Sequence, residues 1–211
     1  MNRYDDRYQA GKILADQLKS YANNPDVLIL ALPRGGVPVA YEIAKALSAP
    51  LDIFVVRKLG VPHHEELAFG AIASSEATVY NQDIIQAYQL SASDINAVLL
   101  KERNELARRE SKYRGSKPFP DLHDKIIILV DDGIATGATM RVAIKALRHQ
   151  YPQRIVLAVP VAAISVLEEL SHLVDEIVCP IKPQDLYAVG AWYDNFSQTL
   201  DEEVFKLLEH N

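Results

Sequence analysis

The chain has 211 residues, 49% of them hydrophobic, and a formal net charge of −6. This length and apolar content suffice for the core of one α/β domain, and we expect a single domain over residues 1–211. The negative charge argues against a general nucleic-acid surface, and no run of about 18 apolar residues predicts a membrane span, so we expect neither kind of partner. The charged first residues lack the apolar stretch of a signal peptide, which favours a cytoplasmic protein.

Residues 26–32 read as a buried strand, and a helical pattern follows after four loop residues, Pro33, Arg34, Gly35 and Gly36. Two adjacent glycines permit close backbone approach, and Arg34 offers a planar set of donors to phosphate oxygens. By itself this pattern is equally typical of an ordinary strand-to-helix turn. The alternative is a loop that binds an anion.

A second strand is expected over residues 51–58, and it ends in two cations, Arg57 and Lys58. Neighbouring side chains on a strand point to opposite faces, so one cation would face a site and the other would face solvent. A solvated strand end is the alternative. Residues 59–67 contain Gly and Pro and are expected to form a loop. Its two adjacent histidines do not converge like metal ligands, and we assign no role to its polar residues, His63, His64, Glu65 and Glu66.

Residues 71–73 and 78–80 alternate in the manner of an antiparallel hairpin, and residues 91–113 read as a long amphipathic helix. Ser91 and Asp94 predict a capping box at the start of this helix. Its other face alternates Glu and Arg, which is typical of a solvated surface and also of an arm in a homodimer. We expect a homodimer.

Residues 127–130 are four apolar residues that read as a buried parallel strand. Asp131 and Asp132 follow where this strand should end, and a loop of small residues then leads into a helical pattern. In open α/β sheets, ligands bind at the carboxyl ends of the strands, and a loop at a helix N-terminus suits a phosphate. Carboxylates accept hydrogen bonds from sugar hydroxyls and can help to hold Mg²⁺. Together these features predict a pocket for a phosphorylated sugar.

The alternation of strands and helices continues along the chain, with strands expected at residues 154–160 and 174–179 and a helix at 164–170. The expected fold is therefore α/β, with a doubly wound, mainly parallel sheet, helices on both faces and a core at about residues 26–180. Cys179, the single cysteine, reads as a small buried hydrophobe. Residues 181–198 are irregular and rich in aromatic rings, which either pack in the core or stack on a planar ligand.

Residues 127–139 resemble the signature of type I phosphoribosyltransferases, which bind phosphoribosyl pyrophosphate (PRPP), and the chain is similar to the bacterial group known as predicted phosphoribosyltransferases. The resemblance implies the fold of that family, with a hairpin and long-helix insertion and a C-terminal hood at about residues 181–198. It implies that Asp131 and Asp132 bind the ribose hydroxyls. The following loop would wrap the 5′-phosphate, and it consists of Gly133, Ile134, Ala135, Thr136, Gly137, Ala138 and Thr139.

The same resemblance implies that the loop from Pro33 to Gly36 binds pyrophosphate, often with a cis peptide bond that is not before proline. A cation at Arg57 or Lys58 would contact the same group. Residues 59–67 would form a mobile loop that excludes water from the site.

The hood resembles that of the 6-oxopurine phosphoribosyltransferases in the spacing of Tyr187, Gly190 and Asp194. This implies that Tyr187 stacks on a heterocyclic acceptor and that Asp194 lies by the metal. Backbone groups of Ala188 and Val189 would bind the polar edge of the acceptor, with Trp192 nearby. Those enzymes also carry a lysine on an earlier strand, whereas residues 157–163 are apolar here, so the acceptor stays unassigned.

The implied reaction is transfer of the 5-phosphoribosyl group from PRPP to a ring nitrogen through an oxocarbenium-like transition state. The implied catalytic residues are Arg34, Arg57, Lys58 and Asp132. Mg²⁺ is the expected cofactor, held mainly by PRPP with Asp131, Asp132 and Asp194. Two alternatives stay open. One is a PRPP-binding regulator without turnover, and the other is a hydrolase whose base would be Asp132, His63 or His64.

Overall fold

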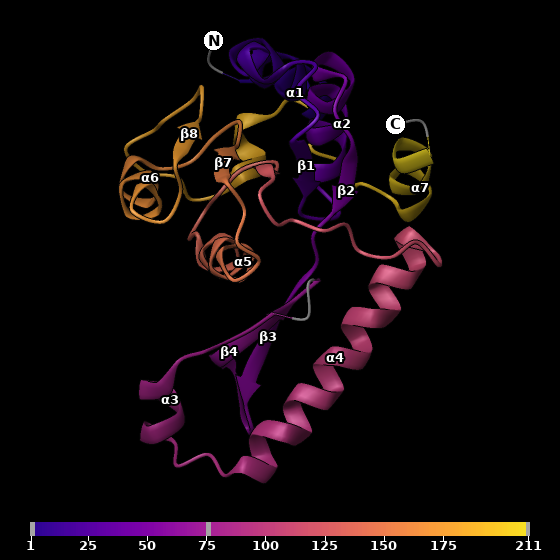
Figure 1. The fold of residues 1–211 in the computed structure, drawn as a ribbon. Helices are drawn as coiled ribbons and strands as arrows, with labels where there is room; N and C mark the ends of the chain where they lie inside the picture. The colour runs from indigo at the N-terminus through magenta and orange to yellow at the C-terminus, as the bar shows by residue number, and fades with distance from the viewer. Residues whose placement is uncertain (1–2, 75–76, 210–211) are drawn as a thin grey trace.

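The computed structural model describes residues 3–74 and 77–209 (Figure 1). Its centre is a five-stranded parallel sheet in the order β2-β1-β6-β7-β8. The strands are β1 (Val27–Ala31), β2 (Leu51–Ile53), β6 (Ile126–Val130), β7 (Arg154–Ala158) and β8 (Glu176–Val178). All five residues of β1 are buried, as are the last four of β6 and of β7. Strands that are covered on both faces need such continuous apolar runs, which is why these segments were recognisable in the sequence.

Helices cover both faces of this sheet, and the expected doubly wound fold is confirmed. The side chains of Ile29 and Ile128 join one core cluster, with α1 (Arg7–Gln17), α2 (Gly36–Leu47) and α7 (Asp201–Glu209). Leu30 and Leu129 face the other way and join the second cluster, with α5 (Ala138–Arg148) and α6 (Ile164–Ser171). The first cluster includes Leu14 and Val204, so the core extends before residue 26 and beyond residue 180.

A second, antiparallel sheet belongs to an arm that extends away from the parallel sheet in Figure 1. It contains β3 (Val56–Val61), β4 (His64–Ala73) and β5 (Thr78–Tyr80). Two helices complete the arm, α3 (Gln82–Ala87) and α4 (Ala92–Arg114), and α4 runs back toward α7. The pairing of Ala71 with Val79 confirms the expected hairpin, whose residues 75–76 lie outside the described part.

Two expectations for the start of the arm were wrong. The expected strand 51–58 is divided, because β2 ends at Ile53 in the parallel sheet and β3 begins at Val56 in the arm. Residues 59–67 are not a loop but mostly strand, with a tight turn at Pro62 and His63. Leu59 and Val61 are buried, and the register shifts beside Gly60, so the glycine marks a bulge rather than a loop.

Charged side chains attach α4 to both sheets. Its N-terminus has the expected capping box, in which the amide of Asp94 donates to Ser91 Oγ at 3.1 Å and the amide of Ser91 donates to Asp94 Oδ2 at 3.0 Å. Arg57 in β3 donates to Glu102 of α4, with an Nη2–Oε2 distance of 2.6 Å. The nearly buried Arg114 bonds Asp52 and the carbonyl of Ile53, both at 3.0 Å. The helix is therefore packed on the molecule and is more than a solvated face.

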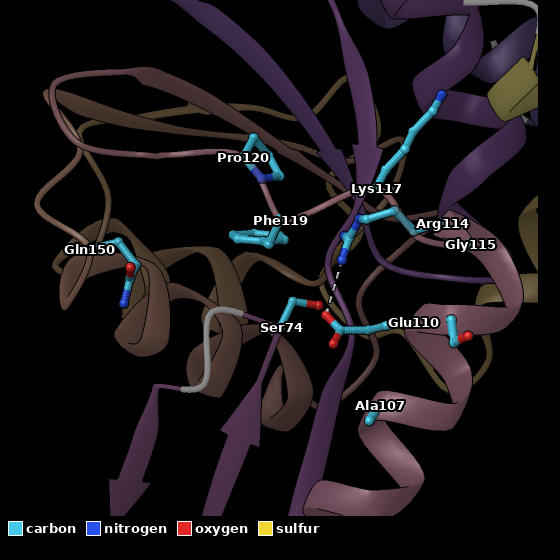
Figure 2. Close-up of a pocket in the computed structure, with 10 residues that line it drawn as sticks. Ser74, Ala107, Glu110, Arg114, Gly115, Lys117, Phe119, Pro120 and Gln150 are labelled. Atoms are coloured by element: carbon cyan, nitrogen blue, oxygen red, sulfur yellow. Dashed lines mark hydrogen bonds and ion pairs between the residues drawn. The ribbon is translucent and has the colours of Figure 1, made fainter.

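Figure 2 shows the residues that line a cavity beside this attachment point, with the Arg114 guanidinium directed at Glu110. The cavity has a volume of about 490 Å³, and the Arg114 guanidinium also lies 4.9 Å from the centre of the Phe119 ring. Its described lining includes Ser74 and Gln150 but no residue of the loops that follow β1 and β6. The remaining short elements are two 3₁₀ turns, Lys19–Tyr21 and Val189–Trp192. Cys179 is buried as expected, and burial raises the pKa of its thiol to about 11. Among the described residues, no helix is long and apolar enough to cross a membrane.

Candidate functional site at the ends of β1 and β6

The loops that follow β1 and β6 lie side by side at the carboxyl edge of the parallel sheet. The two strands are neighbours, and the Leu32 amide donates to the Val130 carbonyl at 2.9 Å. The chain continues from β1 to β2 on one side and from β6 to β7 on the other. The two loops therefore lie at the topological switch point of the sheet, where the connections leave in opposite directions, and this is the usual ligand position in a doubly wound sheet.

Gly35 and Asp132 bring the two loops into contact. A Cβ atom added at Gly35 would lie 2.1 Å from Asp132 Oδ2, so only a glycine permits this approach. The peptide bond between Pro33 and Arg34 is cis, as the family resemblance implied. The backbone of the first loop thus lies directly against the second carboxylate of the acidic pair.

The loop after the acidic pair ends at the N-terminus of α5. Ile134 is buried, and its amide donates to the Val161 carbonyl at 2.9 Å, which ties the loop to the end of β7. Gly137 has a φ of 74° and precedes the first turn of α5. Thr136 and Thr139 are exposed. Exposed hydroxyls beside the free amides of a helix N-terminus can bind a phosphate.

Arg7, which sequence reasoning missed, holds the acidic pair from α1. Its Nε and Nη2 atoms lie 2.9 and 2.8 Å from Asp132 Oδ2. Its Nη1 atom donates to the Ser197 carbonyl at 2.7 Å, and its guanidinium lies 3.9 Å from the centre of the Phe196 ring. No motif marks Arg7, because its partner is 125 residues away in the chain and only the fold brings the two together.

The two carboxyl groups have different electrostatic surroundings. Burial raises the pKa of Asp131 well above its usual range, and the negative charge of Asp132 raises it further. Burial also raises the pKa of Asp132, but the Arg7 guanidinium acts in the opposite direction. Asp131 Oδ1 accepts a hydrogen bond from the Asp132 amide at 2.8 Å. A cation or a hydrogen-bond donor placed at this pair would relieve the cost of keeping both groups ionised.

The aromatic segment lies over the acidic pair, and its rings have different roles. Tyr193 is buried, and its hydroxyl donates to the Asp132 carbonyl at 2.5 Å. Its ring packs 5.4 Å from that of Tyr4 and 5.0 Å from that of Phe196, so this part of the segment belongs to the core. Tyr187, in contrast, is 95% exposed and is not a core residue.

Val189 connects this segment to the loop that follows Asp132. A Cβ atom added at Gly133 would lie 2.5 Å from Val189 Cγ1, so the glycine allows the segment to close onto the loop. Trp192 is partly buried and packs against the cluster that contains Tyr4 and Tyr193. Its carbonyl accepts a hydrogen bond from the Tyr4 amide at 2.9 Å. Tyr187, Ala188, Val189 and Trp192 therefore lie on one segment next to the acidic pair.

Residues 3–192 match the family model described as the phosphoribosyl transferase domain. The chain belongs to this family. The crystal structure of the protein TT1426 from Thermus thermophilus has a TM-score of 0.86 and 37% sequence identity, and the similarity covers 99% of this chain and 98% of that one. The phosphoribosyl transferase fold, with its mainly parallel sheet and an additional antiparallel sheet, is thus shared over the whole length.

Two named relatives are similar in sequence. The "Putative phosphoribosyl transferase Rv0571c" of Mycobacterium tuberculosis is 44% identical over 209 residues, which are 99% of this chain and 47% of that protein. This chain therefore spans about half the length of the mycobacterial protein. The "Bifunctional protein PyrR" of Clostridium acetobutylicum is 28% identical over 132 residues, which are 61% of this chain and 68% of that protein.

Phosphoribosyl transferases generally use Mg²⁺ with PRPP, and the acidic pair fits this use. Mg²⁺ is commonly held by one or two carboxylates together with water and substrate phosphates. Within residues 3–74 and 77–209, no three Asp, Glu, His or Cys side chains converge on a possible metal position. The Asp194 side chain is 65% exposed and lies 4.0 Å from Arg3, so it does not converge with the acidic pair in the described structure.

The three candidate catalytic cations of this phosphoribosyl transferase domain lie in different surroundings. Arg34 lies in the loop after β1, as expected. Arg57 and Lys58 are in β3 of the arm, because the parallel strand before them ends at Ile53. Arg57 is paired with Glu102, and Lys58 is exposed. His63, His64, Glu65 and Glu66 lie at the turn between β3 and β4 and at the start of β4.

Proposed function

We propose that this protein transfers the 5-phosphoribosyl group of PRPP to a ring nitrogen of a planar heterocyclic acceptor and releases pyrophosphate. One observation carries the proposal: Gly35 is in contact with Asp132 at the switch point of the sheet. This contact brings the loop after β1, a candidate phosphate-binding loop, together with the acidic pair that follows β6. In a member of the phosphoribosyl transferase family, this arrangement fits a sugar that carries phosphate groups on two sides.

Different residues bind the ribose, the 5′-phosphate and the pyrophosphate of the substrate. Asp131 and Asp132 accept hydrogen bonds from the ribose hydroxyls, and residues 135–139 hold the 5′-phosphate with amides and threonine hydroxyls at the start of α5. Arg34 lies on the side of the leaving pyrophosphate. Mg²⁺, when bound with PRPP, supplies positive charge to the pyrophosphate oxygens.

In the reaction, the bond from C1 to the pyrophosphate oxygen breaks and a bond from C1 to the acceptor nitrogen forms, with inversion at C1. The nitrogen loses its proton, and the pyrophosphate takes the electron pair of the broken bond. No covalent bond to the protein is needed, so the residues act by positioning the two substrates and by stabilising charge. The aromatic segment over the acidic pair shields the site from water, which would otherwise capture the cationic C1.

We place the acceptor against Tyr187, Ala188, Val189 and Trp192. An aromatic face suits a planar heterocycle, and Tyr187 exposes nearly its whole side chain in the described structure. Backbone groups of Ala188 and Val189 would bind the polar edge of the acceptor, because β7 is apolar beyond its first residue.

Release of pyrophosphate from Mg²⁺–PRPP, measured with and without a panel of purine and pyrimidine bases, tests the proposal. We expect release that depends strictly on one acceptor or one class of acceptors. Release at the same rate without any base would show a hydrolase. PRPP binding without release across the whole panel would show a binding protein and would contradict the proposed transfer.

A further inference from the structure

Asp132 is held at two points, its carboxylate and its main-chain carbonyl. Arg7 binds the carboxylate with nitrogens 2.9 and 2.8 Å from Oδ2. The Tyr193 hydroxyl donates to the carbonyl at 2.5 Å. Hydrogen bonds from behind a binding group keep that group within the narrow range of positions that ligand recognition needs. Both contacts therefore have the geometry of supports for a residue that binds a ligand.

The surroundings of Tyr193 make its hydroxyl a stable donor to this carbonyl. The residue is 3% exposed, and burial, together with the nearby charge of Asp132, holds the pKa of its hydroxyl well above its usual value. The centre of its ring lies 5.4 Å from that of Tyr4 and 5.0 Å from that of Phe196. Close packing of this kind leaves the ring little freedom, so the cluster sets the direction of the hydroxyl.

The hydrogen bond from Tyr193 also orients the peptide group that joins Asp132 to Gly133. This peptide bond is trans, so its N–H points away from the carbonyl oxygen that Tyr193 holds. Gly133 is buried, and its amide has no hydrogen-bond partner among residues 3–74 and 77–209. Buried amides are almost always paired, which favours a ligand atom that accepts a hydrogen bond beside the acidic pair.

Tyr193 belongs to the segment against which we place the acceptor, and this segment is paired with the N-terminal residues. The Tyr4 amide donates to the Trp192 carbonyl at 2.9 Å, and the Asp194 amide donates to the Tyr4 carbonyl at 2.8 Å. The N-terminal residues lead directly into α1, which carries Arg7. Both supports of the second carboxylate therefore come from one paired unit of the chain.

We propose that Tyr193 is a positioning residue for ribose recognition, whose hydroxyl aligns the Asp132 carboxylate and the Gly133 amide with the ribose hydroxyls. A hydroxyl can donate to the carboxylate and accept from the amide at the same time. The inference rests on the proposed function, because it takes the ribose of PRPP as the ligand of the acidic pair. It gives the aromatic segment a role that is separate from stacking on the acceptor.

Tyr193→Phe tests the inference, because it removes one oxygen atom and keeps the ring in the cluster. Calorimetry measures the affinities of the parent and the variant for ribose 5-phosphate and for 2-deoxyribose 5-phosphate, which lacks one hydroxyl. We expect the parent to bind ribose 5-phosphate about tenfold more tightly, as for a hydrogen bond to a charged group. Tyr193→Phe should reduce this preference to about twofold or less, since the carboxylate and the amide are no longer aligned.

Tyr4→Phe is the matched control. Tyr4 is also buried, and its hydroxyl donates to the Pro160 carbonyl at 2.8 Å, at the end of β7 rather than at the acidic pair. The two variants should lower the urea midpoint by similar amounts, but Tyr4→Phe should keep the preference of the parent for ribose 5-phosphate. Unfolded protein binds neither sugar phosphate, so the ratio of the two affinities reports on the folded site even in a destabilised variant.

A preference in Tyr193→Phe equal to that of the parent would overturn the inference and leave the proposed function standing. An equal loss of preference in Tyr4→Phe would also overturn it, because the effect would then come from the aromatic cluster as a whole. A parent that binds neither sugar phosphate, or binds the two equally, would instead contradict the proposed assignment of the ribose to the acidic pair, and the inference would fall with it.

Discussion

Arg7 and Asp132 form a nearly buried ion pair in which two guanidinium nitrogens lie 2.9 and 2.8 Å from one carboxylate oxygen. The same guanidinium reaches the Ser197 carbonyl and the face of Phe196. One side chain therefore joins the N-terminal helix, the acidic pair and the aromatic segment that covers it. Within the described residues, Arg7 donates no hydrogen bond to Asp131, so the ion pair holds only the second carboxylate of the acidic pair.

Arg7→Met should destabilise the protein and weaken PRPP binding. Only 11% of the Arg7 side chain and 15% of the Asp132 side chain are exposed, and breaking a buried pair on one side costs about 3–5 kcal/mol. Urea unfolding measures the free-energy change, and calorimetry measures the PRPP affinity. Arg3→Met is the control, because Arg3 and Asp194 are 4.0 Å apart and largely exposed, and it should cost less than about 1 kcal/mol. Equal stability of the two variants would contradict this role of Arg7.

Asp131→Asn should stabilise the substrate-free protein at neutral pH. Burial raises the pKa of Asp131 in the folded state, so the folded state holds this proton more tightly than the unfolded state. The free energy of unfolding therefore falls as the pH rises from about 4, the unfolded value, through the raised pKa. Asparagine keeps an oxygen for the Asp132 amide and removes this titration.

The stabilisation by Asp131→Asn should accordingly be largest near pH 8 and should shrink toward pH 4. Urea midpoints of the parent and the variant across this range measure it. The prediction is contradicted if the stability difference between variant and parent is constant with pH or grows toward acid. Either result would mean that the folded protein does not favour the protonated form of the Asp131 carboxyl.

Gly35→Ala should weaken PRPP binding by about tenfold or more, because a 1 Å displacement in a site can cost about a hundredfold in activity. Gly35 has a φ of −60° and a ψ of −33°, so alanine fits the backbone there. The effect would come from the new Cβ atom alone, which would meet Asp132 Oδ2 at 2.1 Å. Calorimetry with PRPP and far-ultraviolet circular dichroism together check that binding is lost while the helices persist. Unchanged affinity would mean that the two loops move apart freely.

Tyr187→Ala should lower acceptor turnover without lowering stability. The ring is 95% exposed, so its removal opens no cavity in the core. Trp192 fluorescence should respond little to PRPP and clearly to an acceptor added afterwards, and Tyr187→Ala should abolish the second response. Tyr151→Ala is the matched control, since Tyr151 is also largely exposed and lies just after the turn that follows α5. Normal turnover in Tyr187→Ala would place the acceptor elsewhere.

Much of the fold and part of the site could be predicted from local sequence patterns. The strand before Asp131, the helix after Gly137 and the Ser91 capping box each depend on residues that are adjacent or one turn apart. The division of residues 51–58 could not be predicted this way, because it depends on which sheet each half pairs with. Gly60 looked like a loop residue, although it lies at a bulge between buried strand positions.

The contacts that organise the site could not be predicted from local patterns either, because their partners are far apart in the sequence. Arg7 pairs with Asp132 across 125 residues, and Arg34 approaches Asp201 from a loop far away in the sequence. The sequence around Arg7 is that of an ordinary surface residue, and the loop that marks Arg34 as a candidate gives no sign of Asp201 as its partner. The aromatic segment shows the same limit, because composition alone could not separate the buried Tyr193 from the exposed Tyr187.

Calorimetric binding of PRPP in the presence of Mg²⁺ tests the central claim most directly, with the parent and with the double variant Asp131→Asn, Asp132→Asn. A matched control carries the same change of charge at the exposed positions Asp121 and Asp124. We predict that the parent and the control bind PRPP alike, and that the double variant binds it at least about tenfold more weakly while its circular dichroism spectrum is unchanged. Equal PRPP affinity in the double variant and the parent would contradict the assignment of the ribose to the acidic pair.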